Sequence, residues 1–344
     1  MSAGSENGEK HVESSSSIRV SVIIPTRNRA ALLADVLKAL EKQRFPSDAF
    51  EVFVMDNVST DNTEDVVQAF AERVPFPVRF HRMARNGGPV PARNLGASLA
   101  KGEILAFTDS DCRPCPEWLE RGTAAFEEGV GLVTGPVTYK PEQHGSFFSK
   151  QTAETLVEHP TYPTANAFYR KTAFEELGGF DGDLCFVDPL NRAVECADSD
   201  LAWRIIKSGY RNVFVKDLWV FHEIEEQTPW SWALEPTRLF VLPELVRRHP
   251  ELRERLLFKR VVFYRGALPY YIAPFVALPL AILDWRWLLL APAVLILRSF
   301  MKMKGPSPRS FVRAIHQVSM SVVRNYVLCV TMVYGSIRFR TLVL

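Results

Sequence analysis

The stretch ILAFTDSDCRPC, residues 104–115, places two aspartates one residue apart at the end of a short apolar run. The run Ile104–Thr108 has the length and composition of a buried strand. Asp109 and Asp111 follow it directly, although a carboxylate loses hydration free energy when it is buried. Two carboxylates in this position therefore raise the question of which ligand compensates for that loss.

The chain before this stretch alternates short strands with helical segments. Val20–Ile24, Phe50–Met55 and Val78–His81 have the β-branched and aromatic residues that are typical of strands. Between them, apolar residues recur at helical spacing, and we expect Asn28 to cap the first helix and Asp61 to start the second. This alternation predicts an α/β fold with a mainly parallel sheet that is buried on both faces.

Polar clusters follow three of these predicted strands directly. They are Pro25–Arg27, Asp56 with Asn57, and Asp109–Asp111. Ligands of open α/β sheets bind beyond the carboxyl ends of the strands, so all three clusters are expected to meet at one edge. The two aspartates thus stand where a ligand site is predicted.

Carboxylate oxygens suit hard divalent cations such as Mg²⁺ or Mn²⁺. A cation held by Asp109 and Asp111 can bridge to phosphates and stabilise the negative charge that grows on a phosphate leaving group. The alternative is that the two aspartates merely cap a loop or the start of a helix. Their position beside two other polar strand ends favours the metal site.

The composition of the 344-residue chain is that of a globular protein, with 47% hydrophobic and 23% charged residues. The formal net charge is only +2, which argues against nucleic acid as a partner. Residues 1–17 are polar, and we expect a disordered tail there. Five cysteines without a regular framework favour a reducing compartment, although Cys112 and Cys115 have the spacing of a redox pair or half a zinc site.

Apolar segments near the C-terminus predict contact with a membrane. Residues 267–283 and 288–297 are apolar and are interrupted by Asp284–Trp287. Neither arm reaches the about 20 residues of a straight spanning helix, so we expect a tight membrane hairpin or a re-entrant pair. A third run, Val322–Val333, either spans the membrane, lies in its interface or packs on the hairpin. The alternative is a soluble protein in which the arms form a buried helical hairpin.

Basic residues flank both arms of the predicted hairpin. They gather between Arg238 and Arg265 on one side and between Lys302 and Arg313 on the other. This distribution places both flanks on the cytoplasmic side of a cell membrane. The alternative is a solvated basic face of a soluble helix.

Five motifs occur in an order that is typical of one enzyme family. They are VSVIIPTRNRAALL (20–33), VMDNVSTDNT (54–63), NGGPVPARNLGASLAKGEILAFTDSD (86–111), ELGGFD (176–181) and DSDLAWRIIKSGY (198–210). Together they resemble glycosyltransferase family 2, whose members are inverting, nucleotide-sugar-dependent enzymes with a GT-A fold. The resemblance covers about Val20 to His222. It implies a GT-A domain at 18–232, basic juxtamembrane helices at 233–266 and membrane-associated helices at 267–344.

The resemblance also implies roles for individual residues. Seven match positions on the nucleotide side: Pro25, Thr26, Arg27, Asp56, Arg93, Asn94 and Asp109. Asp109 and Asp111 match the metal motif, in which the second aspartate generally touches Mn²⁺ or Mg²⁺ and the first touches the ribose or sugar. His222 matches a histidine that adds a metal ligand in some relatives, with a satisfied core histidine as the alternative.

Fewer residues match the family's positions for the catalytic base and for the acceptor side. Relatives usually have Glu-Asp before the helix that begins near Ser199, whereas this chain has Ala197 and Asp198. Asp198 therefore matches the base, and Glu195 replaces it if the loop is shifted. Five residues are acceptor-side candidates: Asn166, Arg170, Asp181, Glu195 and Trp230. The Gln-x-x-Arg-Trp motif of processive synthases lacks its arginine at Gln227–Trp230, which argues for the addition of one or a few sugars.

The implied function is transfer of a sugar from a UDP-, GDP- or dTDP-sugar to a lipid, a lipid-linked glycan or a polysaccharide precursor at the cytoplasmic membrane face. One alternative is a non-catalytic sugar-nucleotide-binding or assembly protein of the same fold, suggested by Ala197. The other is a sugar-phosphate nucleotidyltransferase, which would carry a Gly-rich basic loop where Pro25–Asn28 stands.

Overall fold

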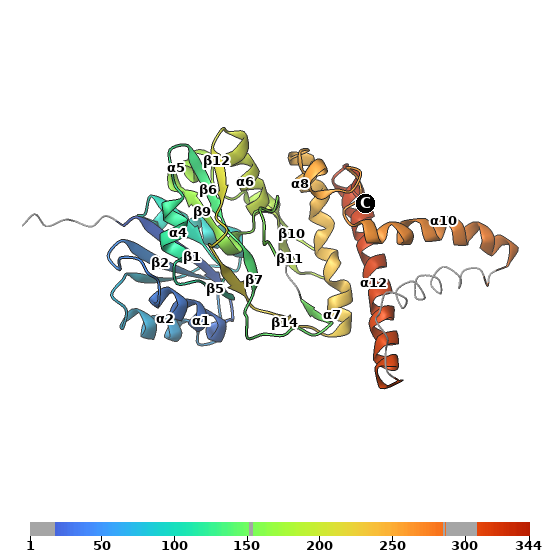
Figure 1. Ribbon diagram of the computed structural model, residues 1–344, viewed down its shortest axis with the longest axis horizontal. Coiled ribbons are helices and arrows are strands. Elements are labelled where there is room, and N and C mark those ends of the chain that lie inside the picture. The colour runs from blue at the N-terminus through green and yellow to red at the C-terminus, as the bar shows by residue number, and fades with distance from the viewer. Residues whose placement is uncertain (1–17, 151–153, 285, 287–307) are drawn as a thin grey trace, which may run out of the picture.

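The computed structural model describes residues 18–150, 154–284, 286 and 308–344. Its centre is a seven-stranded sheet in the order β12-β6-β9-β4-β1-β2-β3 (Figure 1). The strands are β1 (Val20–Thr26), β2 (Phe50–Asp56), β3 (Val78–Arg82), β4 (Ile104–Phe107), β6 (Val130–Thr134), β9 (Ala167–Arg170) and β12 (Arg211–Phe214). Within this sheet β9 alone runs antiparallel to its neighbours. The predicted α/β fold with a mainly parallel sheet is confirmed.

Helices cover both faces of the sheet. The helices of this part are α1 (Ala30–Glu41), α2 (Thr63–Ala71), α3 (Pro89–Leu99), α4 (Trp118–Ala124), α5 (Lys171–Glu176) and α6 (Ala197–Lys207). Ile23 of β1 belongs to the core that includes α3 and α6, whereas its neighbours Val22 and Ile24 belong to the core that includes α1 and α2. Burial on both faces explains why the strands read as continuous apolar runs.

Asp61 lies at the start of α2 as predicted, where it accepts from the N–H of Thr63, but the start of α1 differs from the prediction. Asn28 does not cap α1 but adopts a left-handed backbone conformation (φ 51°), and its side chain accepts a hydrogen bond from the backbone N–H of Thr60. The first turn of α1 is instead capped by Asp61, whose carboxylate accepts from the N–H of Ala30 at 3.1 Å. Asp61 thus joins two strand-end loops, a contact between residues 31 positions apart that local sequence patterns do not reveal.

Smaller pairings extend the carboxyl edge of the sheet. A three-stranded sheet orders β5 (Cys112–Pro114), β13 (Val220–His222) and β7 (Val137–Tyr139). The strands β10 (Cys185–Val187) and β11 (Ala193–Glu195) form a hairpin, and β8 (Ser149–Lys150) pairs with β14 (Glu225–Glu226). The 3₁₀ turns η1 (Thr164–Asn166) and η2 (Gly182–Leu184) lie in the same half of the chain.

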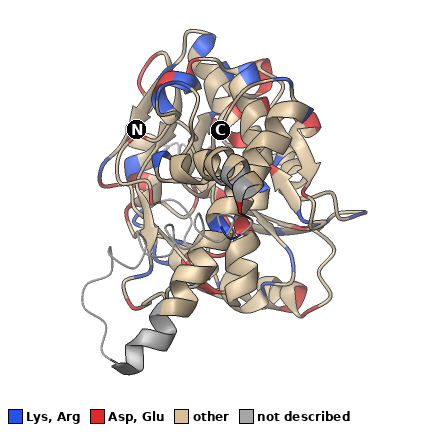
Figure 2. Ribbon diagram, turned by 90° about the vertical axis from the view of Figure 1, so that its right-hand side faces the viewer, with Lys and Arg blue, Asp and Glu red and all other residues tan. Residues whose placement is uncertain are grey.

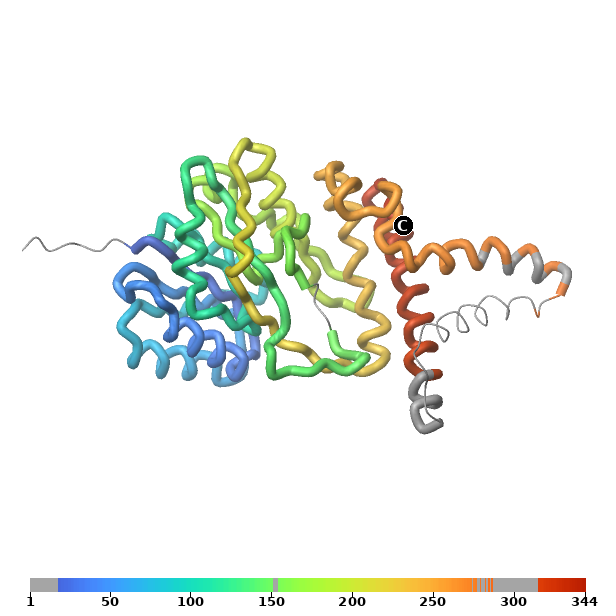
Figure 3. Tube along the Cα trace, in the orientation of Figure 1, coloured from blue at the N-terminus to red at the C-terminus, as the bar shows by residue number. Residues whose placement is uncertain are grey.

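The C-terminal third is helical. Its elements are α7 (Pro229–Leu234), η3 (Glu235–Val241), α8 (Leu242–Arg248), α9 (Leu252–Leu256), η4 (Arg265–Ala267), α10 (Leu268–Leu283) and α12 (Pro308–Arg338). The long helix α12 packs along α7, η3 and α8, while α10 projects away from the rest of the protein (Figures 1 and 3). The sheet domain and α12 therefore sandwich the helices α7 to α8.

The structure describes only part of the predicted membrane hairpin. The first apolar arm forms α10, and the second arm, 288–297, lies outside the described residues. The third run forms part of α12, and Ile315–Arg338 is the one helix in the described ranges that is long and apolar enough to cross a membrane. That helix passes the test by length and composition, and 44% of its most apolar window is buried inside the protein.

The basic residues ahead of α10 make contacts within the protein. Arg247 pairs with Glu244, and Arg248 pairs with both Glu244 and Asp181. Arg248 thus helps to hold α8 on the sheet domain, whereas the pair of Arg247 with Glu244 lies within α8 itself. The charges of both arginines are partly neutralised there, so the basic run is a weaker sign of a lipid surface than its sequence suggests.

Candidate functional site

A cleft of about 550 Å³ opens at the carboxyl ends of the parallel strands. Pro25, Thr26 and Arg27 line it at the end of β1, as predicted for a strand-end site. Asp109–Asp111, which follow β4, line it from the neighbouring strand end. The sheet topology therefore brings the predicted strand-end clusters together.

The end of β2 contributes Asn57 to the wall of the cleft. Asp56 itself is buried, and its carboxylate accepts from the N–H of Ser59 and from Nε of Arg82 at 2.9 Å. Asn57 donates through Nδ2 to the carbonyl of Gly88 at 2.8 Å, and its Oδ1 has no partner. Thr26 Oγ1 is likewise buried without a partner. Two unsatisfied polar atoms in one cleft wall are a feature of a site that a polar ligand completes.

Arg93 of α3 joins two carboxylates that are far apart in the sequence. Its Nη2 lies 2.8 Å from Asp109 Oδ1, and its Nη1 lies 2.6 Å from Glu195 Oε1. Burial alone would lower the pKa of Arg93, but the charges of Glu195 and Asp109 raise it above its ordinary value. The guanidinium therefore stays charged and fixes the orientation of Asp109 toward α3.

The second aspartate of the pair faces His222. Strand β5 pairs antiparallel with β13 so that Cys112 lies opposite His222, and the N–H of Glu223 donates to the carbonyl of Asp111 at 2.9 Å. His222 Nε2 lies 3.5 Å from Asp111 Oδ1. The other ring nitrogen, Nδ1, lies 2.7 Å from the carbonyl of Glu223, which can only accept a hydrogen bond. Nδ1 therefore carries a proton, and Nε2 is the ring nitrogen that lies on the side of Asp111.

This arrangement fits a divalent cation. Ligand atoms of Asp111, Cys112 and His222 lie within 4.8 Å of one another. Burial, together with the charges of Asp109 and Asp111, raises the pKa of the Cys112 thiol well above its ordinary value, so the thiolate that a metal requires is disfavoured. The remaining oxygen and imidazole donors are those that Mn²⁺ accepts. The guanidinium of Arg29 pairs with Asp111 Oδ2 on the side away from His222.

Asp198 occupies the first turn of α6, where its Oδ1 accepts from the N–H of Ser199 at 2.7 Å. Burial raises the pKa of the Asp198 carboxyl to about 7, and the negative charge of Glu195 adds to the shift. A carboxyl with a pKa near neutrality is suited to taking up a proton in a reaction at that pH.

The chain is similar to known proteins in both sequence and structure. Residues 21–179 match the model of the family described as Glycosyl transferase family 2. Residues 21–179 belong to glycosyltransferase family 2. The chain is 31% identical over 212 residues to glycosyltransferase AglE of Haloferax volcanii, which covers 58% of this chain and 65% of that protein. It is 40% identical over 280 residues to validoxylamine A glucosyltransferase of Streptomyces hygroscopicus subsp. jinggangensis, which covers 70% of this chain and 63% of that protein.

The chain thus spans slightly less than two thirds of the length of these relatives. Among solved structures, it resembles mannosyltransferase PcManGT from Pyrobaculum calidifontis in complex with GDP-Man and Mn²⁺, with a TM-score of 0.57 and 21% identity. That match covers 94% of this chain and 87% of the other. At this identity the likeness supports the GT-A fold.

Asp198 does not line the cleft, and neither do three further residues predicted for the site. Asn94 is bonded to the backbone of Phe180 through both ends of its amide, so it holds a turn rather than facing the cleft. Asn166 is buried and bonded to Trp118 and to two backbone carbonyls. Arg170 lies opposite Ile104, at the far edge of the sheet from the cleft, and donates to the carbonyls of Val130 and Glu127.

Two further acceptor-side candidates have other environments. Asp181 accepts from Arg248 and from the N–H of Asp183, which starts η2. Trp230 on α7 is 61% exposed. Glu195 is the one predicted acceptor-side residue that lines a described cavity.

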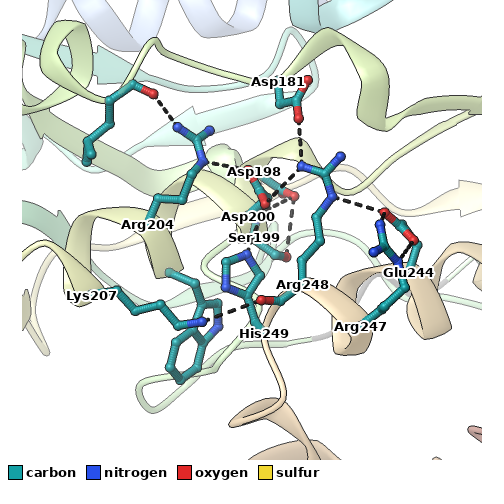
Figure 4. Close-up of polar contacts among 12 residues, drawn as sticks. Asp181, Asp198, Ser199, Asp200, Arg204, Lys207, Glu244, Arg247, Arg248 and His249 are labelled. Atoms are coloured by element: carbon teal, nitrogen blue, oxygen red, sulfur yellow. Dashed lines mark hydrogen bonds and ion pairs between the residues drawn. The ribbon is translucent and has the colours of Figure 1, made fainter. Parts of the chain in front are cut away.

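A buried network fixes the helix that carries Asp198 (Figure 4). His249, which follows α8, donates from Nε2 to Asp200 Oδ1 at 2.9 Å, and Arg204 donates to Asp200 Oδ2 at 2.7 Å. Arg248 lies beside them and bridges Asp181, at 2.6 Å, to Glu244, at 3.0 Å. The separation of 49 residues between Asp200 and His249 hides this pair from sequence analysis.

Sequence reasoning also missed several cations of the cleft. Arg29, Lys150 and Arg238 line it in addition to Arg27 and Arg93. Arg29 stands within the first motif, Arg238 begins the basic run that was assigned to the membrane flank, and Lys150 comes from a segment without a recognisable pattern. Five basic side chains around one cleft are a setting for a ligand with several negative charges.

Proposed function

We propose that this chain is an inverting glycosyltransferase that moves a sugar from a nucleotide diphosphate sugar to a hydroxyl group of an acceptor. The observation that carries the proposal is the single cleft in which Asp111, His222 and five basic side chains meet. A diphosphate has the charge to match this lining, and the unpartnered atoms of Thr26 and Asn57 are available to the nucleoside.

Asp111 and His222 would hold Mn²⁺ or Mg²⁺, which supplies positive charge against the negative charge that grows on the departing diphosphate. Asp109 has a different task, because its Oδ1 is bonded to Arg93. It is oriented to accept a hydrogen bond from a ribose or sugar hydroxyl. Arg29 and Lys150 add charge on the same side of the cleft.

Asp198 is proposed as the base of a single displacement. The acceptor oxygen forms a bond to the anomeric carbon, and the bond from that carbon to the diphosphate oxygen breaks. The nucleoside diphosphate leaves with the electron pair, and the proton of the acceptor hydroxyl passes to Asp198. Attack opposite the leaving group inverts the configuration at the anomeric carbon.

Glu195 is the alternative base. Its Oε1 is bonded to Arg93, and its Oε2 is buried without a partner. We favour Asp198 because the pKa of its carboxyl is raised to about 7, which lets it both accept and release a proton near neutral pH. Glu195 would then orient the acceptor through Oε2.

We further propose that the enzyme works at a membrane. None of the 16 residues of helix α10 is charged. In Figure 2 this helix points toward the viewer. Its side chains Phe275 and Ile282 are 80% and 87% exposed. An apolar helix that stands clear of the protein in this way is stable when lipid covers it. The proposed acceptors are a lipid, a lipid-linked glycan or a polysaccharide precursor, with addition of one or a few sugars.

The experiment that tests the proposal is hydrolysis and transfer of UDP-, GDP- and dTDP-sugars by the detergent-solubilised full chain with Mn²⁺. A glycosyltransferase hydrolyses its own donor slowly in the absence of acceptor, and EDTA stops the reaction. Thermal stabilisation by a nucleotide sugar without any turnover would instead identify a sugar-nucleotide-binding protein. Release of pyrophosphate from a nucleoside triphosphate would identify a nucleotidyltransferase.

A further inference from the structure

A second cavity of about 380 Å³ adjoins the nucleotide cleft. Three segments enclose it: the turn before α3, the β10–β11 hairpin and η3. The hairpin lies between the sheet domain and the C-terminal helices (Figure 1). Of its lining, the proposed chemistry uses only Glu195 and Arg238.

The lining of the second cavity differs in kind from that of the cleft. Apart from Glu195 and Arg238, its walls consist of glycine, proline, cysteine and apolar side chains, among them Phe186, Val194 and Leu239. Phe186 packs in turn on the rings of Phe240 and Phe339 at 6.0 and 5.4 Å, so the wall is anchored to the end of α12. The cavity is therefore a fixed apolar chamber beside the helix that is apolar enough to cross a membrane.

The chamber is continuous with the nucleotide cleft. Gly88, Pro89, Ala193 and Arg238 line both cavities. Glu195 stands at the junction, where Arg93 holds Oε1 and leaves Oε2 buried without a partner. A molecule in the chamber can thus present a hydroxyl group to Glu195 while it faces the cleft.

We propose that this chamber binds the acceptor and selects an alcohol with an apolar body. The inference rests on the proposed function, since it names the class of acceptor for the same site. An apolar body gains free energy from the walls, and the single hydroxyl is satisfied by Glu195. A glycan in the same place would bury many hydroxyl groups against Phe186, Val194 and Leu239, which offer them no hydrogen-bond partner. The chamber therefore favours a lipid-like acceptor over a polysaccharide chain.

Cys185 provides a direct probe of the chamber. It lines the cavity and is exposed, whereas the other four cysteines are buried. Burial and the charge of Glu195 raise the pKa of the Cys185 thiol to about 11, so alkylation is run at mildly alkaline pH. The full chain in lipid nanodiscs is labelled with a neutral maleimide, and Cys185→Ser identifies the labelled site by loss of the signal.

Protection of Cys185 is then measured with straight-chain primary alcohols from methanol to octanol, kept below their solubility limits. The concentration that gives half protection is expected to fall about fourfold for each added methylene until the chamber is filled. Val194→Asp is expected to abolish this dependence on chain length. Val187→Asp is the matched control, because Val187 lies on the same hairpin but is exposed and does not line the cavity.

Equal protection by methanol and octanol, or protection by free disaccharides alone, would overturn the proposal. Absence of protection by every compound would overturn it as well. Nucleotide binding in the presence of Mn²⁺, measured as thermal stabilisation of the same samples, tests the proposed function separately. A chain that binds nucleotide but shows no length-dependent protection keeps its function and loses this acceptor assignment.

Discussion

The two cavities that meet at Arg238 are built from opposite kinds of side chain. The nucleotide cleft is lined by strand ends with five basic residues and the Asp109–Asp111 pair, while the chamber beside it is almost wholly apolar. The cleft is assembled largely from residues before position 112, and the chamber mainly from 185–241. If the two cavities bind donor and acceptor as proposed, charge dominates the recognition of the donor and apolar burial dominates that of the acceptor.

Asp111 lines the cleft but not the chamber, and its substitution is expected to have the largest effect on activity. Asp111→Asn removes the carboxylate proposed to hold the cation, which is worth several kcal/mol of stabilisation of the leaving group. Transfer activity, measured as kcat/KM for the donor, is expected to fall about 1,000-fold. Asp65→Asn on the exposed face of α2 is the control and should leave kcat/KM unchanged. Full activity of Asp111→Asn with an unchanged Mn²⁺ requirement would contradict the assignment.

The next effect separates chemistry from donor binding. Asp198→Asn is expected to lower kcat about 1,000-fold, because it removes the proton acceptor but leaves the nucleotide cleft intact. The affinity for nucleotide, measured by calorimetry with Mn²⁺, should not change. The same variant should raise the melting temperature, since a neutral amide replaces a carboxyl that burial disfavours. If Glu195→Gln shows the larger loss of kcat, Glu195 is the base.

The pH dependence follows from the raised pKa of Asp198. Transfer activity should rise about tenfold per pH unit up to about pH 7 and then level off, as the carboxyl loses its proton. Stability should change in the opposite direction. Because the pKa is higher in the folded than in the unfolded chain, the contribution of this group is fully present below about pH 4 and is lost as pH rises through about 7. Melting curves of wild type and Asp198→Asn should therefore converge as the pH falls.

The smallest effect on activity is expected at the contact between α6 and His249, the residue that follows α8. His249→Ala removes the donor to buried Asp200 and should lower the stability by about 1–3 kcal/mol, measured by thermal unfolding. We expect kcat to fall a few-fold, with the donor KM unchanged, because α6 carries Asp198 but not the nucleotide site. His249→Gln retains a side-chain donor and should recover part of both losses. Glu175→Ala removes a surface ion pair with Lys171 on α5 and serves as the control without effect.

Features of the cleft that lie within one local segment could be predicted from the sequence. The parallel sheet follows from the apolar runs that end at Thr26, Asp56 and Phe107, and the strand-end rule correctly brought Pro25, Thr26 and Asp109 to one cleft. These signals are local, since each strand carries its own polar end. The predicted fold class and family are confirmed for that reason.

Contacts between distant segments were not accessible in this way. Glu195 meets Arg93 across 102 residues, and His249 meets Asp200 across 49, with no local pattern for either pair. Asn94 was assigned to the nucleotide side through its neighbour Arg93, yet successive helical residues face different directions, and Asn94 holds the Phe180 turn instead. Arg170 and Asn166 were placed by their motif region, although β9 runs antiparallel and carries Arg170 to the opposite edge of the sheet.

The central claim is that Asp111 and His222 together hold a cation against the diphosphate of a nucleotide sugar. It is tested most directly by the structure of the full chain with Mn²⁺ and a nucleoside diphosphate, using the anomalous scattering of manganese to locate the ion. We expect one manganese ion bound to Asp111 and to His222 Nε2, with diphosphate oxygens at its remaining positions. A manganese peak away from both residues, or a nucleotide bound outside the cleft that Thr26 and Asn57 line, would contradict it.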